Sequence, residues 1–423
     1  MRSQLASLGY ALTAIAGVVA EVSYDGAKAI RIPVGEDVFP VMDIIRKLDL
    51  ATWKGVSAAG IPTANSNVDV VVTADKIAQF DELAKDMTLD VLHEDLGASI
   101  LAEGRQSRNV AATAVDLSWF NSYHEYADHV TYLKELQAQY PDNSEIVVAG
   151  NSWAGRPITG IHFWGTAKGK PAVVLHSTVH AREWITTMTT EYLAYTLLSG
   201  YSSSAEIKGF VDKYDYYVFP VVNPDGFVYT QTNDRLWRKN RQTISTNRCV
   251  GRDINRNWPF KWEVTGGAST DPCSETYKGQ SAGDAPENII LRNYLNNIAA
   301  TQKLQLYIDV HSYSQLFMTP YGYSCSALAT NNAEFQSLAK GVSAAIRAVY
   351  GTAYQYGPIC TTIYQATGSA VDYANDISKA KYPFTIELRD TGRYGFILPP
   401  SQILPTVVET YAGFKYLLQN MIL

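Results

Sequence analysis

The spacing of hydrophobic and polar positions divides most of the chain into two regions. In the first region, β-branched runs typical of strands cover residues 30–34, 68–73 and 89–93. Two stretches between them have the apolar spacing of amphipathic helices, at residues 38–48 and 74–87. This order predicts a small α/β open sandwich, which we place at residues 21–112.

The second region, residues 113–423, alternates β-branched runs with longer amphipathic stretches. Strands are predicted at residues 171–180, 214–222, 304–311 and 384–388, and helices at residues 184–198 and 288–301. This alternation predicts an α/β fold in which a mixed sheet is flanked by helices. Ligands collect at the ends of strands in such sheets, so polar residues that directly follow a strand are the first candidates for a site.

The chain begins with a cation, Arg2, and an apolar stretch over residues 5–20 that ends in Val18 and Ala20, at the positions a signal peptidase recognises. The stretch is shorter than the roughly 20 apolar residues of a membrane-spanning helix. We therefore expect a signal peptide at residues 1–20 and a secreted, extracellular protein without a membrane partner. An ordinary first helix of a cytosolic protein is the alternative.

A polar segment at residues 103–109 separates the two regions. It contains Arg105 and Arg108, so an exposed linker that a trypsin-like protease cuts is one interpretation, and a plain interdomain linker is the other.

Composition supports a protein with more than one folded unit. Of 423 residues, 46% are hydrophobic and 18% charged, which excludes a disordered chain. The formal net charge is -6, so nucleic acid is not an expected partner. Residues 21–112 carry 9 Lys and Arg against 15 Asp and Glu, whereas residues 113–423 carry 25 against 26, so the acidity belongs to the first region. Four Cys are compatible with two disulfides if the protein is exported.

A candidate metal site lies at the ends of two predicted strands. His180 and Glu183 follow the strand at residues 171–180, and His311 ends the strand at residues 304–311. One His beside one Glu is more often a structural pair, but two His and a carboxylate, with a fourth position left to water, are the ligands of a catalytic zinc. We interpret His176 as a core residue or a neighbour of the site. The remaining histidines have no partner motif: His93, His124, His129 and His162.

A catalytic zinc also needs a base and a group that stabilises the oxyanion. Glu387 ends the strand at residues 384–388, and Arg389 is a possible structural partner for it. The stretch DRLWRKNR offers Arg235, Arg238 and Arg241 for the oxyanion, although a solvated basic face is the alternative. Asn255 and Arg256, in DINRNW, suit a substrate with a free terminal carboxylate because Arg captures carboxylates in a bidentate manner.

Eight motifs occur together and in order along the chain: HAREW, NPDG, DRLWRKNR, DINRNW, CSETYKG, HSYSQ, TTIYQATG and FTIELRDTGRYGF. With them, the chain after the signal resembles the metallocarboxypeptidase A family, whose members are secreted as procarboxypeptidases. The resemblance implies an activation propeptide at residues 21–112 and a zinc carboxypeptidase catalytic domain at residues 113–423. It also implies that the mixed sheet of the catalytic domain has eight strands.

The resemblance assigns roles to individual residues. It implies one Zn²⁺ bound by His180, Glu183 and His311, with Glu387 as general base and Arg238 at the oxyanion. Residues implied to bind the terminal carboxylate are Asn255, Arg256 and Tyr364. Outer substrate subsites are implied for Arg182, Arg235, Ser312, Tyr313 and Phe396. Disulfides are implied between Cys249 and Cys273 and between Cys325 and Cys360.

Substrate preference follows from the implied specificity pocket. Val371 falls at the floor of this pocket, which is apolar in A-type members. Other pocket positions match Met318, Gly322, Ile359, Ile363, Ala366 and Thr385, and none is charged. A cationic side chain would be desolvated there without a counter-ion, so Lys and Arg should be rejected.

The expected protein is a secreted, monomeric zymogen whose own propeptide is an intramolecular inhibitor. After activation by a trypsin-like protease, it should release hydrophobic C-terminal residues, aromatic or aliphatic, from peptides or proteins. The competing hypotheses are a zinc deacylase for small N-acyl amino acids and a non-catalytic zinc-containing binding protein. Hydrolysis of peptides longer than two residues would reject the first, and turnover that a chelator abolishes would reject the second.

Overall fold

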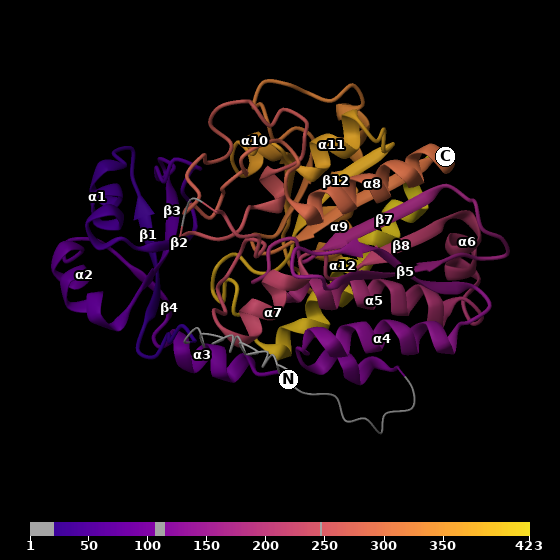
Figure 1. Cartoon of the computed structure of the whole chain (residues 1–423), viewed down its shortest axis with the longest axis horizontal. Coiled ribbons are helices and arrows are strands. Elements are labelled where there is room, and N and C mark those ends of the chain that lie inside the picture. Colours follow the sequence, from indigo (N-terminus) through magenta and orange to yellow (C-terminus); the bar gives the residue numbers. More distant parts are fainter. Residues whose placement is uncertain (1–20, 106–114, 246–247) are drawn as a thin grey trace, which may run out of the picture.

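The computed structural model describes residues 21–105, 115–245 and 248–423. They form a small N-terminal domain, coloured indigo in Figure 1, and a large domain beside it. The predicted signal peptide lies outside the described residues, as does Arg108 of the predicted linker.

The small domain is an antiparallel sheet covered by helices. The strand order is β2-β3-β1-β4, formed by Ala51–Lys54, Ser66–Val72, Lys28–Val34 and Asp90–His93. Its two longest strands pair with Ile30 opposite Val70 and Ile32 opposite Val68. These four side chains are buried in one core with residues of α1 (Phe39–Leu48) and α2 (Ile77–Leu83), which is the predicted open sandwich.

Three details of this domain differ from the prediction. The helix predicted at residues 74–87 is a 3₁₀ turn, Ala74–Lys76, followed by the shorter α2. Strand β2 was not predicted because it has only four residues, of which one has a buried side chain, and so it shows no periodicity of hydrophobic positions. Helix α3 (Leu96–Glu103) was also missed, and its last residue, Glu103, is buried, so the exposed linker does not begin there.

The large domain is built on an eight-stranded mixed sheet with the order β11-β10-β12-β9-β7-β8-β6-β5. Four parallel strands form its centre, β12 (Tyr382–Glu387), β9 (Leu304–His311), β7 (Ala172–Ser177) and β8 (Asp215–Phe219). The outer strands are β11 (Gln355–Pro358), β10 (Leu316–Thr319), β6 (Pro157–Phe163) and β5 (Ser144–Asn151).

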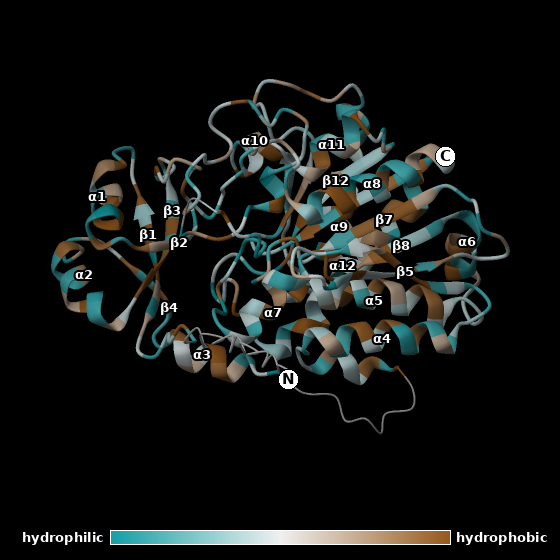
Figure 2. Cartoon of the chain, viewed as in Figure 1, coloured by the Kyte–Doolittle hydropathy of each residue, from teal (hydrophilic) through white to brown (hydrophobic). Residues whose placement is uncertain are grey.

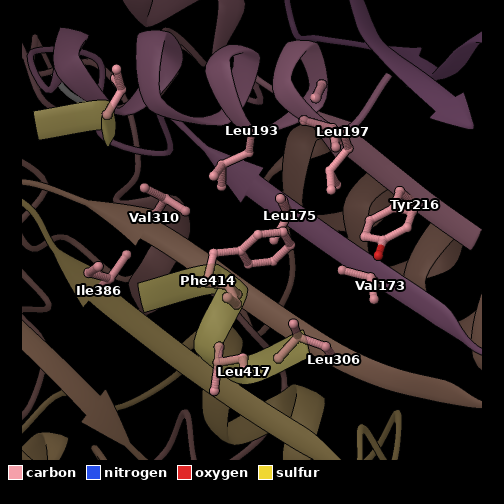
Figure 3. Close-up of a cluster of buried hydrophobic side chains, with 14 of the residues drawn as sticks. Val173, Leu175, Leu193, Leu197, Tyr216, Leu306, Val310, Ile386, Phe414 and Leu417 are labelled. Atoms are coloured by element: carbon pink, nitrogen blue, oxygen red, sulfur yellow. The ribbon is translucent and has the colours of Figure 1, made fainter. Parts of the chain in front are cut away.

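Helices cover both faces of this sheet because the central strands are apolar on both sides. Val173 and Leu175 of β7 pack on one face against α5 (Trp184–Gly200) and α12 (Ile403–Asn420), in the cluster drawn in Figure 3. Val174, between them, packs on the other face with α8 (Pro286–Thr301) and α11 (Ala370–Asp376). The remaining helices are α4 (Tyr126–Gln139), α6 (Ala205–Lys213), α7 (Pro224–Thr232), α9 (Asn332–Tyr350) and α10 (Ile359–Thr362).

The outer helices keep a polar side. Along α4 hydrophilic and hydrophobic residues alternate, as Figure 2 shows, because only one side of the helix packs on the core. Within the described residues, no helix is long and apolar enough to cross a membrane. All four cysteines are paired, Cys249 with Cys273 and Cys325 with Cys360.

Candidate active site

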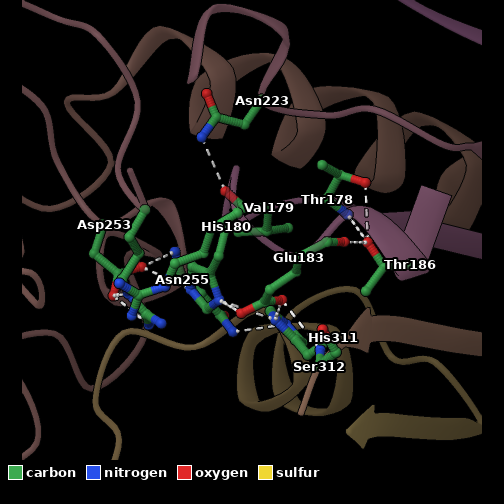
Figure 4. A network of polar contacts seen from close by, with 12 residues as sticks. Thr178, Val179, His180, Glu183, Thr186, Asn223, Asp253, Asn255, His311 and Ser312 are labelled. Atoms are coloured by element: carbon green, nitrogen blue, oxygen red, sulfur yellow. Dashed lines mark hydrogen bonds and ion pairs between the residues drawn. The ribbon is translucent and has the colours of Figure 1, made fainter. Parts of the chain in front are cut away.

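Three metal-ligating side chains converge at one edge of the large sheet (Figure 4). His311 is the last residue of β9, and His180 follows the neighbouring parallel strand β7, so both leave the sheet at the same edge. Glu183 is the residue that precedes α5. Nδ1 of His180 lies 2.8 Å from Oε1 of Glu183, and Nδ1 of His311 lies 3.1 Å from Oε2 of the same carboxylate.

The loop that carries His180 is fixed by hydrogen bonds on both sides (Figure 4). Thr178 has a positive φ of 57°, and its N–H donates to Oγ1 of Thr186 in α5 at 3.0 Å. The Nδ2 group of Asn223 donates to the carbonyl of Val179 at 3.0 Å. These contacts hold the turn from strand to helix in the shape that places His180 over Glu183.

This donor set fits a zinc ion. The two Nδ1 atoms lie only 3.1 Å apart, and one ligand atom from each of the three residues falls within 4.8 Å of the others. All three residues are buried. Burial would raise the pKa of Glu183, but His180 and His311 outweigh it and lower that pKa below its usual range. Two imidazoles and an ionised carboxylate are ligands that Zn²⁺ takes in hydrolytic sites.

A carboxylate that the sequence analysis missed, Asp253, stands behind this cluster. Its Oδ1 lies 3.2 Å from Nε2 of His180, and its Oδ2 accepts hydrogen bonds from Arg238 at 2.8 and 3.1 Å. Burial would raise the pKa of Asp253, but Arg238 and His180 hold it well below its usual range. The only sequence signal was its place in DINRNW, next to the predicted Asn255 and Arg256.

Glu387 ends β12 in register with His311 on the neighbouring strand. Its Oε2 is buried and has no hydrogen-bond partner among the described residues. Burial and the nearby Glu183 raise the pKa of Glu387 to about 8. The predicted structural partner was wrong: Arg389 pairs with Glu409 of α12 at 2.5 and 2.7 Å, because the strand ends between Glu387 and Arg389.

The predicted carboxylate binders lie beside the cluster. Asn255 places Nδ2 3.2 Å from Nε2 of His311, and its Oδ1 accepts the N–H of Ala370. Arg256 is buried, donates to the carbonyl of Asn255 at 2.9 Å and has no carboxylate partner within the described parts of the chain. Its guanidinium lies 5.7 Å from the ring of Tyr364, which has no polar contact of its own in the described structure.

A cavity of about 40 Å³ opens between these groups. Its wall includes His180, His311, Glu387, Arg256 and Tyr364 on one side. The other lining residues are mostly apolar: Met318, Ile359, Ile363, Ala366, Val371 and Thr385, with Asn255 and the unpredicted Ser369.

Two residues next to this cavity do not face it. Asp372 follows Val371 but accepts the N–H groups of Gly322 and Tyr323, and burial raises its pKa to about 7. Gly322 does not line the cavity. A Cβ there would meet the carbonyl of Ala366 at 2.7 Å, so this glycine permits close packing instead.

The small domain covers the open side of the site. Thr52 to Ser57 of this domain share a second cavity, of about 180 Å³, with Arg182, Arg238, Ser312 and Glu387. Several predicted outer-subsite residues contact this domain directly. The hydroxyl of Tyr313 donates to Asp69 at 2.7 Å, and the ring of Phe396 packs edge-on against Trp53.

The two arginines predicted for outer subsites are each paired with a carboxylate. Arg235 forms a bidentate ion pair with Glu103 of the small domain at 2.6 and 2.7 Å. Arg182 pairs with Glu275 of the large domain at 3.1 Å and lies over the ring of Phe396. The basic stretch is therefore not a solvated face: Arg235 and Arg238 are buried, and Arg241 stacks on Tyr229.

The remaining histidines have structural partners. His93 contacts the carbonyl of Tyr394, His124 contacts the carbonyl of Trp119, His129 contacts Glu191, and His162 contacts Glu145. Nδ1 of His176, on β7, lies 3.3 Å from the hydroxyl of Tyr307, and burial lowers its pKa to about 4. None of these five belongs to the metal-ligating cluster.

Two histidines and a glutamate beside a second buried carboxylate define the class of single-zinc hydrolases. A family model described as zinc carboxypeptidase matches residues 129–413, and one described as carboxypeptidase activation peptide matches residues 41–103. The chain belongs to the zinc carboxypeptidase family.

Individual relatives agree with this assignment. The chain is 47% identical to a metallocarboxypeptidase A of Trichophyton equinum, with both chains fully covered. It is 34% identical to carboxypeptidase A4 of Mus musculus, over 96% of each. The crystal structure of thrombin activatable fibrinolysis inhibitor covers 94% of this chain and is itself covered to 99%, with 27% identity and a TM-score of 0.86.

The chain is therefore a zinc carboxypeptidase zymogen with an activation peptide, and its cofactor is Zn²⁺. The activation peptide implies intramolecular inhibition and peptide substrates. The deacylase and the non-catalytic binding protein are excluded by this family assignment.

Proposed function

We propose that the processed enzyme removes hydrophobic residues, aromatic or aliphatic, from the C-termini of peptides. In this proposal Arg256, Asn255 and Tyr364 hold the terminal carboxylate of the substrate. The side chain of the last residue enters the small cavity above Val371. A cationic side chain would find no acidic partner there, because Asp372 is turned toward backbone N–H groups.

The catalytic steps belong to Glu387 and Arg238. His180, Glu183 and His311 would hold the zinc ion, which would polarise the scissile carbonyl and lower the pKa of a water. Glu387 takes the proton of the attacking water on its free Oε2 and passes it to the leaving amine. Arg238, held by Asp253, donates to the oxyanion that develops on the carbonyl oxygen.

One observation carries this proposal. Arg256 is a buried guanidinium without a carboxylate partner among the described residues, and it shares a wall of the 40 Å³ cavity with Glu387 and Val371. A free carboxylate beside an apolar side chain is the chemical signature of a peptide C-terminus.

The test is C-terminal profiling of a peptide library with the processed enzyme and with its Glu387→Gln variant. We expect release of Phe, Tyr, Leu and similar residues, with Lys and Arg spared. The variant should keep its zinc and lose activity by a factor on the order of 10³ or more, because it has no base. Release of Lys or Arg at comparable rates, or normal hydrolysis by Glu387→Gln, would contradict the proposal.

We also propose the processing route of the precursor. Residues 1–20 are a signal peptide, residues 21–112 the propeptide and residues 113–423 a monomeric, secreted catalytic domain released by a trypsin-like protease. The two disulfides support export, since such bonds persist outside the reducing cytosol. N-terminal sequencing of the protein from the culture medium, before and after trypsin, tests both boundaries.

A further inference from the structure

Arg235 is bound to a carboxylate that leaves with the propeptide. Its Nε and Nη2 atoms donate to the two oxygens of Glu103 at 2.6 and 2.7 Å, a fork-to-fork pair in which both side chains are buried. Glu103 ends α3, and the match to the activation peptide ends at the same residue. Activation therefore removes this acceptor from Arg235.

The rest of the Arg235 environment belongs to the large domain and stays. Nη1 donates to the carbonyl of Arg182 at 2.9 Å, and Nη2 donates to the carbonyl of Phe396 at 2.9 Å. The guanidinium also stacks over the ring of Trp184 at 3.7 Å. These contacts fix the plane of the guanidinium, so it keeps the orientation that receives a carboxylate after Glu103 has gone.

Among the described residues, Glu103 is the only carboxylate that forms an ion pair with Arg235. Glu275, which also lines the cleft, is paired with Arg182. Arg182 and Phe396, the two carbonyl partners of Arg235, line the cavity of about 180 Å³ that also contains Glu387. The vacated position therefore lies on the route of a peptide that enters the active site.

We propose that Arg235 makes the processed enzyme selective for substrates with Asp or Glu a few residues upstream of the scissile bond. The carboxylate of that residue takes the position of Glu103 in the zymogen. The inference rests on the proposed carboxypeptidase activity and adds a second determinant to the apolar pocket. A released propeptide can also supply a carboxylate to Arg235, through Glu103 itself.

The experiment uses full chain that has been processed and freed of propeptide. Peptides ending in Phe carry either Glu or Gln at one of the second to sixth positions from the C-terminus, and kcat/KM is measured for each pair. At one position we expect Glu to be preferred on the order of tenfold, chiefly through KM, as for a charge-assisted hydrogen bond. Arg235→Gln should bring this ratio close to one, and Arg235→Lys should leave an intermediate ratio because Lys lacks the fork.

Arg156→Gln is the matched control, since it removes an arginine of the large domain that is paired with Asp225 and lines neither cavity of the site. Its Glu-to-Gln ratio should stay near that of the unsubstituted enzyme. Urea unfolding of each variant separates a folding defect from a change in selectivity. Equal rates for every Glu and Gln pair, or a preference that survives Arg235→Gln, would overturn the inference. Failure to hydrolyse even the Gln peptides would instead contradict the proposed function.

A second arm separates the two sources of the carboxylate. A peptide of residues 96–103 with an amidated C-terminus is tested as an inhibitor, together with its Glu103→Gln analogue. If the peptide with Glu103 inhibits and its Gln analogue does not, the site beside Arg235 binds Glu103 of the released propeptide as well as an acidic substrate residue. If neither peptide inhibits and the substrate preference remains, the site binds the substrate residue alone.

Discussion

Asp253 connects two functional groups through one carboxylate. It contacts the ring nitrogen of His180 that faces away from the metal-ligating cluster and, with its other oxygen, holds Arg238. Such a partner orients the imidazole and raises its basicity toward a metal. In the function that we propose, a metal ligand and the oxyanion donor are thus positioned by the same side chain.

Substituting Asp253 should therefore change zinc binding as well as activity. We expect Asp253→Asn to weaken zinc affinity by about 10- to 100-fold, because the amide is a poorer acceptor for His180. Competition with a chromogenic chelator measures this without reference to turnover. The exposed Asp142→Asn is the matched control. Unchanged zinc affinity in Asp253→Asn would show that Asp253 serves Arg238 alone.

In the binding mode that we propose, Val371 at the floor of the small cavity determines which charge the pocket accepts on the substrate side chain. Val371→Asp should convert the pocket to one that accepts Lys and Arg, with a change in the Arg-to-Phe ratio of kcat/KM on the order of 10²-fold or more. Val371→Ile, which keeps the pocket apolar, is the control. The prediction fails if Phe remains the preferred C-terminal residue of the Asp variant.

Residues at strand ends were predictable, and tertiary partners were not. Polar groups at or just after the end of an apolar strand cost free energy to bury unless they have a partner or a function. This cost is why the sequence analysis selected His180, Glu183, His311 and Glu387. Arg389 was assigned to the adjacent Glu387, but its partner is Glu409, on a helix whose packing no local pattern reveals.

At the scale of elements, the four strands predicted for the large domain are its four central parallel strands. Nearly all of their side chains are buried, and apolar residues predominate on both faces, which gives a strong strand signal. The four outer strands, β5, β6, β10 and β11, were not predicted. Strands β5 and β11 are partly exposed, and their sequences, SEIVVAGN and QYGP, carry a weaker signal. Strand β6, PITGIHF, contains Pro and Gly, and β10 has only four residues, LFMT.

The pairing of Arg389 with Glu409 fastens the end of β12 to α12. Glu409 is fully buried, so its replacement leaves an uncompensated guanidinium. We expect Glu409→Gln to lower the free energy of unfolding by about 3–5 kcal/mol in urea titrations. Glu206→Gln, in the exposed pair with Lys415, should cost less than about 1 kcal/mol. Equal losses in the two variants would contradict this difference.

At the scale of the whole molecule, the interface between propeptide and large domain contains a titratable histidine. His93 lies at the domain interface, with Nε2 2.9 Å from the carbonyl of Tyr394 and Nδ1 2.8 Å from the hydroxyl of Ser99. Burial lowers its pKa from the ordinary value, although the Tyr394 carbonyl and Asp390 oppose this. The docked state therefore binds fewer protons at His93 than the undocked state.

It follows that His93 favours docking above its undocked pKa of about 6.5, and that this contribution is lost as the pH falls below that value. We expect propeptide cut from the enzyme to dissociate faster at pH 5.5 than at pH 7.5, measured by size-exclusion chromatography. The pKa of Glu103 at the same interface is raised by burial, against the pull of Arg235, and acts in the opposite direction. His93→Gln isolates the histidine: its dissociation should lack this acid step, and an unchanged step in the variant would exclude His93 as the cause.

Asp69 bonds to both domains at once, because its carboxylate pairs with Arg31 inside the propeptide and accepts the hydroxyl of Tyr313 from the large domain. We therefore expect folding of the propeptide and its binding to the enzyme to be coupled. A propeptide that loses its fold also loses its hold on the enzyme, and the enzyme in turn acts as a template that raises the melting temperature of the propeptide. On this account only a correctly folded propeptide inhibits the enzyme to which it is attached.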